Sequence, residues 1–165
     1  MAKRISIELI DGIREVAHEV ATRYARHLMG LRYCDIRIEV AEGRSAAAEN
    51  GQEKASAEDY GLSFGVRVLG EHGGVVAPGY FGQTLGSADV QYIGRILQAG
   101  LRHALERARA NAEHKSAARG RFPRLGTTLY DTDLATIPVH QDSVSAIYTW
   151  DPREVSLARV VTYVA

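Results

Sequence analysis

The chain has 165 residues, of which 45% are apolar and 24% are charged, and its 20 basic and 20 acidic side chains give a formal net charge of zero. This composition is typical of one folded domain with a buried core. It excludes a disordered polyelectrolyte and a protein that coats nucleic acid along its whole length. One cysteine allows no internal disulfide, and no apolar run approaches the roughly 18 residues of a membrane helix. We therefore predict a soluble cytoplasmic protein, with residues 1–165 as a single domain.

Residues 6–29 are predicted to form a long helix that begins at Ser6 and ends at Gly30. Its apolar side chains recur every three or four residues and define one buried face: Leu9, Ile13, Val16, Val20, Tyr24 and Leu28. Residues 33–40 then alternate, which predicts a half-buried strand. One face of that strand carries Cys34, Ile36, Ile38 and Val40, and the other carries Asp35, Arg37 and Glu39. Cys34 is accordingly predicted to be a small core residue.

Two hairpins are predicted in the segment that follows. Asn50-Gly51, in the middle of residues 44–57, is a strong signal for a two-residue turn, although the flanking alanines are weak strand formers. Residues 61–69 alternate clearly, with one face formed by Leu62, Phe64, Val66 and Val68 and the other by Ser63, Gly65 and Arg67. A glycine-rich turn over residues 70–74 joins this strand to residues 75–81. These short connections predict antiparallel strands.

A second long helix is predicted over residues 88–114, with Ser87 as its cap. Its buried stripe consists of Val90, Ile93, Leu97, Leu101, Ala104, Ala108 and Ala112. Residues 121–165 are predicted to form a looser tail, with a strand over 145–150 and an apolar segment, 154–164, compatible with helix or strand. The predicted fold class is α+β: a mostly antiparallel sheet of about four or five strands, with two long helices packed on one face.

Motifs for catalysis are missing from the chain. His18-Glu19 begins like a zinc-protease helix, but that chemistry needs a second histidine four residues after the first, where this sequence has Thr22. There is no Gly-x-Ser-x-Gly elbow, and the glycine-rich turns lack the Lys-Ser/Thr ending of a phosphate loop. We therefore identify no catalytic and no metal-binding residues in this chain, and a stand-alone enzyme with an unrecognised site stays open as an alternative.

Four segments occur in a distinctive order: Tyr33-Cys-Asp-Ile-Arg-Ile, Asn50-Gly51, Gly61-Leu-Ser-Phe-Gly-Val-Arg-Val-Leu69 and the Gly73-Gly74 turn. This order resembles the N-terminal domain of the TldD/PmbA proteins, once labelled modulators of DNA gyrase. In that family a helix leads into a strand of pattern (A/S)-x-Y-x-(D/E)-x-R, and a later strand has the pattern G-x-x-x-R-V-L. The second long helix matches in position, and Asp151-Pro-Arg-Glu-Val-Ser-Leu looks like the family's linker before its next helix. Pro78-Gly79-Tyr80 departs from the family's Gly-Phe-Ala/Ser stretch after the turn.

The resemblance implies a part of a zinc metallopeptidase that acts on peptides and works as paired related subunits. The family's zinc ligands lie in a C-terminal half that this sequence does not contain, so the resemblance assigns no catalytic residue and no cofactor to this chain. It implies instead a non-catalytic domain that shapes peptide access and subunit association. The expected partners are a C-terminal peptidase half or a related subunit, and a peptide.

A peptide groove is predicted beside Arg67, Tyr80 and Phe81, because Arg67 lies on the less apolar face of its strand and the two aromatic residues follow the hairpin. An exposed edge of an antiparallel sheet also binds extended peptides by strand addition. The alternative is that Phe81 belongs to the core and Arg67 is a solvated or ion-paired side chain.

A different function is suggested by the charge of the second helix. Residues 95–124 hold eight Arg or Lys against two Glu, and Arg95, Arg102 and Arg109 would lie on one basic face. Such a face would make the chain a stand-alone binding module for an acidic partner or nucleic acid. The helix lacks an aromatic stacking platform, because Tyr92 stands alone, so nucleic acid is the less favoured partner.

Overall fold

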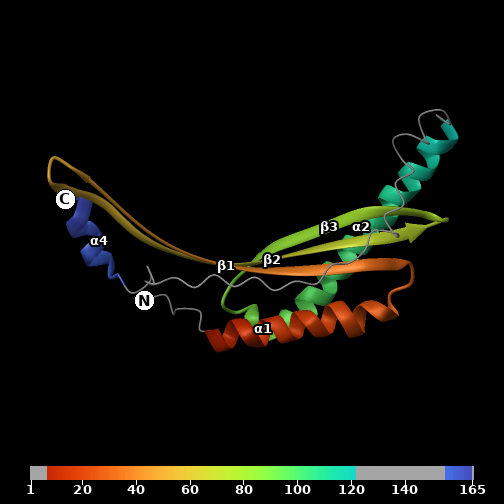
Figure 1. Ribbon diagram of the computed structural model, residues 1–165, viewed down its shortest axis with the longest axis horizontal. Helices are drawn as coiled ribbons and strands as arrows, with labels where there is room; N and C mark the ends of the chain where they lie inside the picture. Colours follow the sequence, from red (N-terminus) through yellow and green to blue (C-terminus); the bar gives the residue numbers. More distant parts are fainter. Residues whose placement is uncertain (1–6, 122–154, 165) are drawn as a thin grey trace. The chain divides into compact units, whose positions relative to one another are not determined.

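The computed structural model describes residues 7–121 and 155–164, and its contacts divide the chain into two compact units (Figure 1). The larger unit contains the described residues 7–39 and 62–121, and the smaller unit contains 40–61 and 155–164. Two long strands contribute residues to both units.

The first helical segment of the larger unit is present but is not a regular helix. Helix α1 spans Ile7–Glu19 and is followed by a π-helical turn, Val20–Tyr24, and a 3₁₀ turn, Ala25–His27. The N–H of Ala25 donates to the carbonyl of Val20, five residues back, which is the hydrogen bond of a π turn. This wider turn brings Ala25 to the buried side together with Val20. The expectation of one continuous helix over 6–29 is therefore corrected, since local packing changes the helical period.

The sheet has the order β1-β2-β3, and its strands are β1 (Leu31–Glu49), β2 (Gln52–His72) and β3 (Val75–Leu85). Strands β2 and β3 are antiparallel, from Leu62 opposite Leu85 to His72 opposite Val75. The predicted turn between β1 and β2 is confirmed, because Asn50 and Gly51 both have positive φ angles, of 54° and 74°.

The number of strands is smaller than expected. Strands β1 and β2 each continue through residues that were expected to separate shorter strands, so the described residues form three strands instead of four or five. Small and charged residues interrupt the alternation of apolar side chains, but they do not interrupt the backbone hydrogen bonds of a ladder. The strand expected over 145–150 lies outside the described residues.

The second long helix, α2 (Ile93–Arg121), follows a 3₁₀ turn over Val90–Tyr92. The position before this turn is occupied by Asp89 and not by Ser87, which corrects the predicted cap. The carboxylate of Asp89 accepts a hydrogen bond from the N–H of Gly86 at 2.7 Å. The apolar stripe of α2 is confirmed over most of its length, with Leu97, Leu101, Ala104, Ala108 and Ala112 completely buried.

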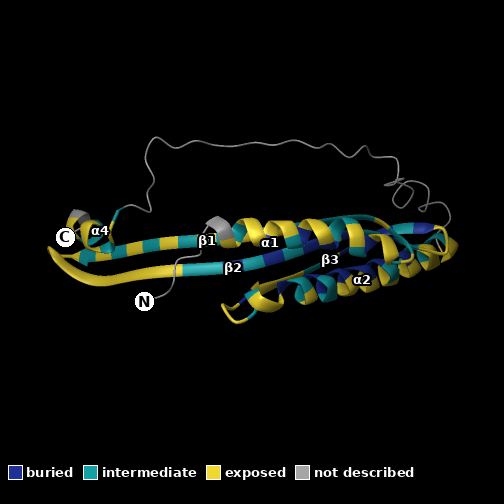
Figure 2. Cartoon of the chain, turned by 90° about the horizontal axis from the view of Figure 1, so that it is seen from below, coloured by how far each residue is buried: buried dark blue, intermediate teal, exposed yellow. Residues whose placement is uncertain are grey.

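Both helices pack on one face of the sheet, as predicted, and the buried residues gather where they meet the strands (Figure 2). Helix α2 approaches β3 so closely that a Cβ atom on Gly79 would lie 2.1 Å from the carbonyl oxygen of Ala104. Glycine in the strand and alanine in the helix thus allow a backbone-to-backbone approach that larger side chains would prevent.

The smaller unit contains the far end of the β1–β2 hairpin and helix α4 (Leu157–Val164). Arg44 of β1 pairs with Glu58 of β2 at 3.1 Å and donates a hydrogen bond to the carbonyl of Val155, just before α4. The apolar segment 154–164, whose sequence is compatible with helix or strand, contains helix α4. Among the described residues, no helix is long and apolar enough to cross a membrane.

Candidate functional site

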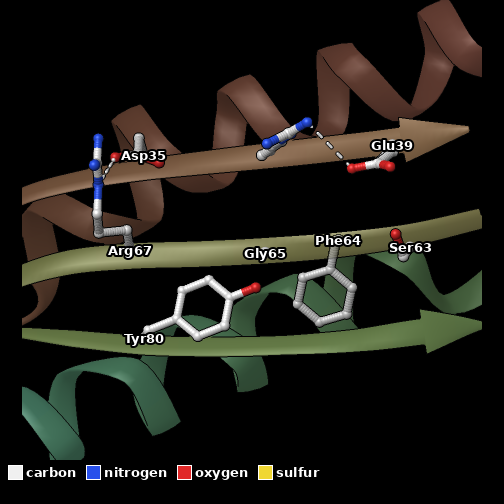
Figure 3. Close-up of a pocket in the computed structure, with 8 residues that line it drawn as sticks. Asp35, Glu39, Ser63, Phe64, Gly65, Arg67 and Tyr80 are labelled. Atoms are coloured by element: carbon white, nitrogen blue, oxygen red, sulfur yellow. Dashed lines mark hydrogen bonds and ion pairs between the residues drawn. The ribbon is translucent and has the colours of Figure 1, made fainter.

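A groove with a volume of about 350 Å³ lies on the face of the sheet that the helices leave open (Figure 3). It is entirely within the larger unit and is formed by all three strands. Its lining residues are Asp35, Arg37, Glu39, Ser63, Phe64, Gly65, Arg67 and Tyr80. The alternation of strands places these polar side chains opposite the apolar ones that contact the helices.

One end of the groove holds an oriented guanidinium. Arg67 of β2 donates from Nε to Oδ2 of Asp35 on β1 at 2.7 Å, and the hydrogen-bond geometry is visible in Figure 3. The hydrogen bond and charge of Asp35 raise the pKa of Arg67 above its ordinary value, and a hydrogen bond with Tyr33 contributes in the same direction. The Arg67 side chain remains 65% exposed, so it is held in place and still open to a ligand.

The wall formed by β1 carries a second ion pair. Nη2 of Arg37 lies 3.2 Å from Oε2 of Glu39, two residues further along the same face of the strand. Both side chains are largely exposed, and a pair of this kind contributes little to stability. The groove thus has two positive and two negative groups, and each forms a pair within the groove.

The opposite wall is formed by Tyr80 of β3, whose ring covers a pair of glycines. Gly65 and Gly82 are opposite each other in the β2–β3 register. A Cβ atom on Gly65 would lie 2.9 Å from the Tyr80 hydroxyl oxygen, and one on Gly82 would lie 2.6 Å from it. The ring therefore lies close to the sheet. Beneath the ring, the floor of the groove is the backbone of the two glycines, without side chains.

The structure brings together two of the three residues predicted for the groove. Arg67 and Tyr80 are opposite each other in the β2–β3 register and both line the groove. Phe81 points to the other face, where its ring centroid lies 6.1 Å from that of Phe64 and 5.2 Å from that of His103. The prediction that Phe81 borders the groove is corrected, because adjacent residues of a strand lie on opposite faces. The alternative expected for Arg67, an ion-paired side chain, is the one that the structure shows.

Strand addition at the outer edge of β3 is obstructed by helix α2. Three side chains of α2, spaced four residues apart, donate to alternate carbonyls of β3: Arg107 to Tyr80 at 2.9 Å, Asn111 to Pro78 at 2.8 Å and Lys115 to Val76 at 3.2 Å. The spacings agree, because four helical residues rise about 6 Å and two strand residues about 6.7 Å. Pro78 also has no N–H to offer. A peptide at this edge would have to displace the three donors, whereas the open face requires no such exchange.

The three arginines predicted for a basic helix face are in different environments. Arg95 and Arg102 are exposed on α2. Arg109 is half-buried, and its Nη2 donates a hydrogen bond to the carbonyl of Met29 in the connection between the first helical segment and β1. Part of the charge of α2 therefore stabilises the fold.

Other reactive groups do not form a site in the described part of the chain. No cluster of three or more His, Cys, Asp or Glu side chains there could hold a metal ion. Cys34 is half-buried on the helix-covered side of β1, and burial, with the adjacent charge of Asp35, raises the pKa of its thiol to about 12. A thiol with such a pKa is a poor nucleophile near neutral pH.

Comparisons with protein-family models, with curated proteins and with solved structures give no significant match to this chain. The assignment of function therefore depends on the groove itself.

Most groove residues were not predicted as such from the sequence. The alternation predicts Asp35, Arg37 and Glu39 on the polar face of one strand, and Ser63 and Gly65 on the polar face of another. The alternation gave the correct faces, but only the pairing of β1 with β2 brings the two faces together. The same alternation, applied at Tyr80, would have separated Phe81 from the groove.

Proposed function

We propose that this chain is a non-catalytic peptide-binding domain, which presents its open sheet face to extended peptides. The observation that supports this proposal is the groove of about 350 Å³ between Arg67 and Tyr80, over the glycine floor. The exposed Tyr80 ring, which lies over Gly65 and Gly82, offers an apolar surface against which a peptide can pack, and the paired charges around it offer both hydrogen-bond donors and acceptors.

In the wider proposal, the chain serves as the N-terminal domain of a cytoplasmic TldD/PmbA-like metallopeptidase. The motifs along β1 and β2 and the position of the second long helix support this proposal. The domain would guide peptides and help subunits associate, while a C-terminal half or a related subunit would hold the zinc and cleave the peptide.

Peptide binding is tested by NMR on the ¹⁵N-labelled chain, titrated with a pool of random octapeptides that are acetylated and amidated at their ends. We expect shifts in the amide signals of Gly65, Arg67 and Gly82, while those of Ala104 and Ala108, behind the sheet, stay in place. Shifts confined to α2, or none at millimolar peptide, would contradict the proposal.

A matched pair of variants localises the binding. Gly65→Val places a side chain on the groove floor, where even a Cβ atom meets the Tyr80 ring, and we expect it to abolish the shifts. Gly43→Val makes the same change in β1, where the nearest atom to an added Cβ is 3.8 Å away, in the smaller unit. It should leave peptide binding unchanged.

The alternative function, a stand-alone module whose basic helix face binds an acidic partner or nucleic acid, is supported by the exposure of Arg95 and Arg102. The hydrogen bond of Arg109 to Met29 leaves fewer charges for a phosphate backbone. If this function holds, the affinity for a single-stranded oligonucleotide should fall steeply with salt and weaken in Arg95→Gln. Binding that is insensitive to salt would exclude it.

A further inference from the structure

The charged groups of the groove differ in how firmly they are held. Arg67 is attached through Nε to Asp35, whose own side chain is only 35% exposed. Arg37 pairs with Glu39, and these side chains are 78% and 57% exposed. A ligand that meets Arg67 therefore meets a group with less conformational freedom to lose than Arg37.

Arg67 has further N–H donors beyond the one that binds Asp35, and they suit a carboxylate. A guanidinium has five N–H donors, and Asp35 and Tyr33 together account for only part of them. Because Asp35 accepts its hydrogen bond from Nε of Arg67, N–H groups on the two terminal nitrogens of Arg67 remain for a second acceptor. Planar N–H pairs of this kind match the two oxygens of a carboxylate.

The position of Arg67 allows a carboxylate and an apolar part of the same ligand to bind together. Arg67 is opposite Tyr80 in the β2–β3 register, and the Gly65–Gly82 pair is two residues further along. The glycine floor thus begins beside the guanidinium and is covered by the Tyr80 ring, which is exposed enough to pack against the aliphatic part of a ligand side chain.

We propose that Arg67 anchors a carboxylate of the bound peptide, so that the groove selects acidic peptides. This inference rests on the proposed function and adds its specificity. The carboxylate is that of an Asp or Glu side chain of the peptide. Asp35 acts as a positioning residue, because it orients the guanidinium through Nε and does not itself contact the carboxylate.

The test uses two pools of random octapeptides and the immobilised full chain, with mass spectrometry of the retained peptides. In one pool both ends are capped, so Asp and Glu carry the only carboxylates, and in the other the C-terminus is free. We expect Asp and Glu to be enriched roughly tenfold among the peptides retained from the capped pool. Preferential retention of the free pool without this enrichment would assign the carboxylate to the C-terminus and overturn the inference.

Two variants make the test specific to the groove. Arg67→Gln removes the charge and the planar pair of N–H donors, and it should abolish the enrichment. Arg102→Gln makes the same change at an exposed arginine of α2 and should leave the preference intact. Arg67→Lys should restore it only in part, because a lysine ammonium cannot form the two parallel hydrogen bonds. Far-UV circular dichroism checks that each variant is folded.

The possible failures are distinguishable. Peptides retained by the wild-type chain without a preference for carboxylates would overturn this inference and leave the proposed function standing. A carboxylate preference that persists in Arg67→Gln would also overturn it. Absence of any retained peptide would contradict the proposed function, and this inference with it.

Discussion

The two faces of the sheet in the larger unit consist of the same strands, yet they have opposite chemistry. Val66 and Val68 of β2 are completely buried against the helices, while Arg67 between them has a side chain that is 65% exposed. The helix-covered face contains apolar side chains and close backbone contacts. The open face contains ion pairs, an exposed tyrosine and two glycines without side-chain cover other than that ring.

One face of the sheet therefore contributes most of the stability, and the other face is available to bind a ligand. Removing apolar atoms from the helix-covered face leaves cavities, and adding atoms to it creates overlaps, so both changes cost free energy of unfolding. Exposed ion pairs contribute little to that free energy, so the open face is free to be optimised for a ligand. The following predictions test how complete this separation of the two faces is.

The largest expected effect concerns the reactivity of Cys34. Its thiol pKa is raised from 9.0 to about 12, so at pH 8 the folded chain should have a thiolate fraction about a thousandfold smaller than the unfolded chain. Reaction with a disulfide reagent at pH 8 should be correspondingly slow in buffer and fast in urea.

Because the unfolded thiol loses its proton first, the free energy of unfolding should fall as pH rises from 9 towards 12.

A control for Cys34 uses the other face of the same strand. Arg37→Cys in a Cys34→Ala background places the thiol on the exposed side of β1. It should react at the rate of a free thiol without urea. Equal rates for the two thiols in buffer would show that the helices do not shield β1.

The next effect concerns the close approach of α2 and β3. In Gly79→Ala the added Cβ atom would lie 2.1 Å from the carbonyl oxygen of Ala104, so the helix has to move. We expect a loss of about 1–3 kcal/mol in the free energy of unfolding, measured by urea denaturation. Gly12→Ala is the matched control: Gly12 is exposed within α1 and nothing lies within 4 Å of an added Cβ. It should stabilise the chain by roughly 0.5–1 kcal/mol.

The smallest effect on stability is expected on the open face. Arg67→Gln breaks an exposed ion pair with Asp35, and the free energy of unfolding should change by less than about 0.5 kcal/mol. The same urea experiment measures it. A loss of several kcal/mol would mean that the pair stabilises the sheet, and the separation of the two faces would be wrong.

Much of the fold was predictable from local patterns in the sequence. The alternation around Val66 predicted which side chains of β2 face the core, and Asn50-Gly51 predicted the turn between the two long strands. Both signals are local, because side-chain direction in a strand and the φ angles of a tight turn depend on neighbouring residues. Strand ends were less predictable, since a ladder continues through small and charged residues.

The groove was predictable only in part. Arg67 and Tyr80 were identified, but their partners on β1 were not, because Asp35 is 32 residues from Arg67 and meets it only through strand pairing. The hydrogen bonds from α2 to β3 could likewise not be predicted, because the sequence does not indicate that a basic side chain such as Arg107 donates to a carbonyl of β3.

The sequence by itself thus determined the α+β fold class, most of the apolar faces and the turn between β1 and β2, all of which follow from short-range patterns. Only the tertiary structure decided that Arg67 meets Asp35, that Tyr80 covers the Gly65–Gly82 pair and that α2 protects the edge of β3. These contacts join residues that are distant in the chain. They depend on strand register and on the distance between helix and sheet, and packing of the whole unit sets both.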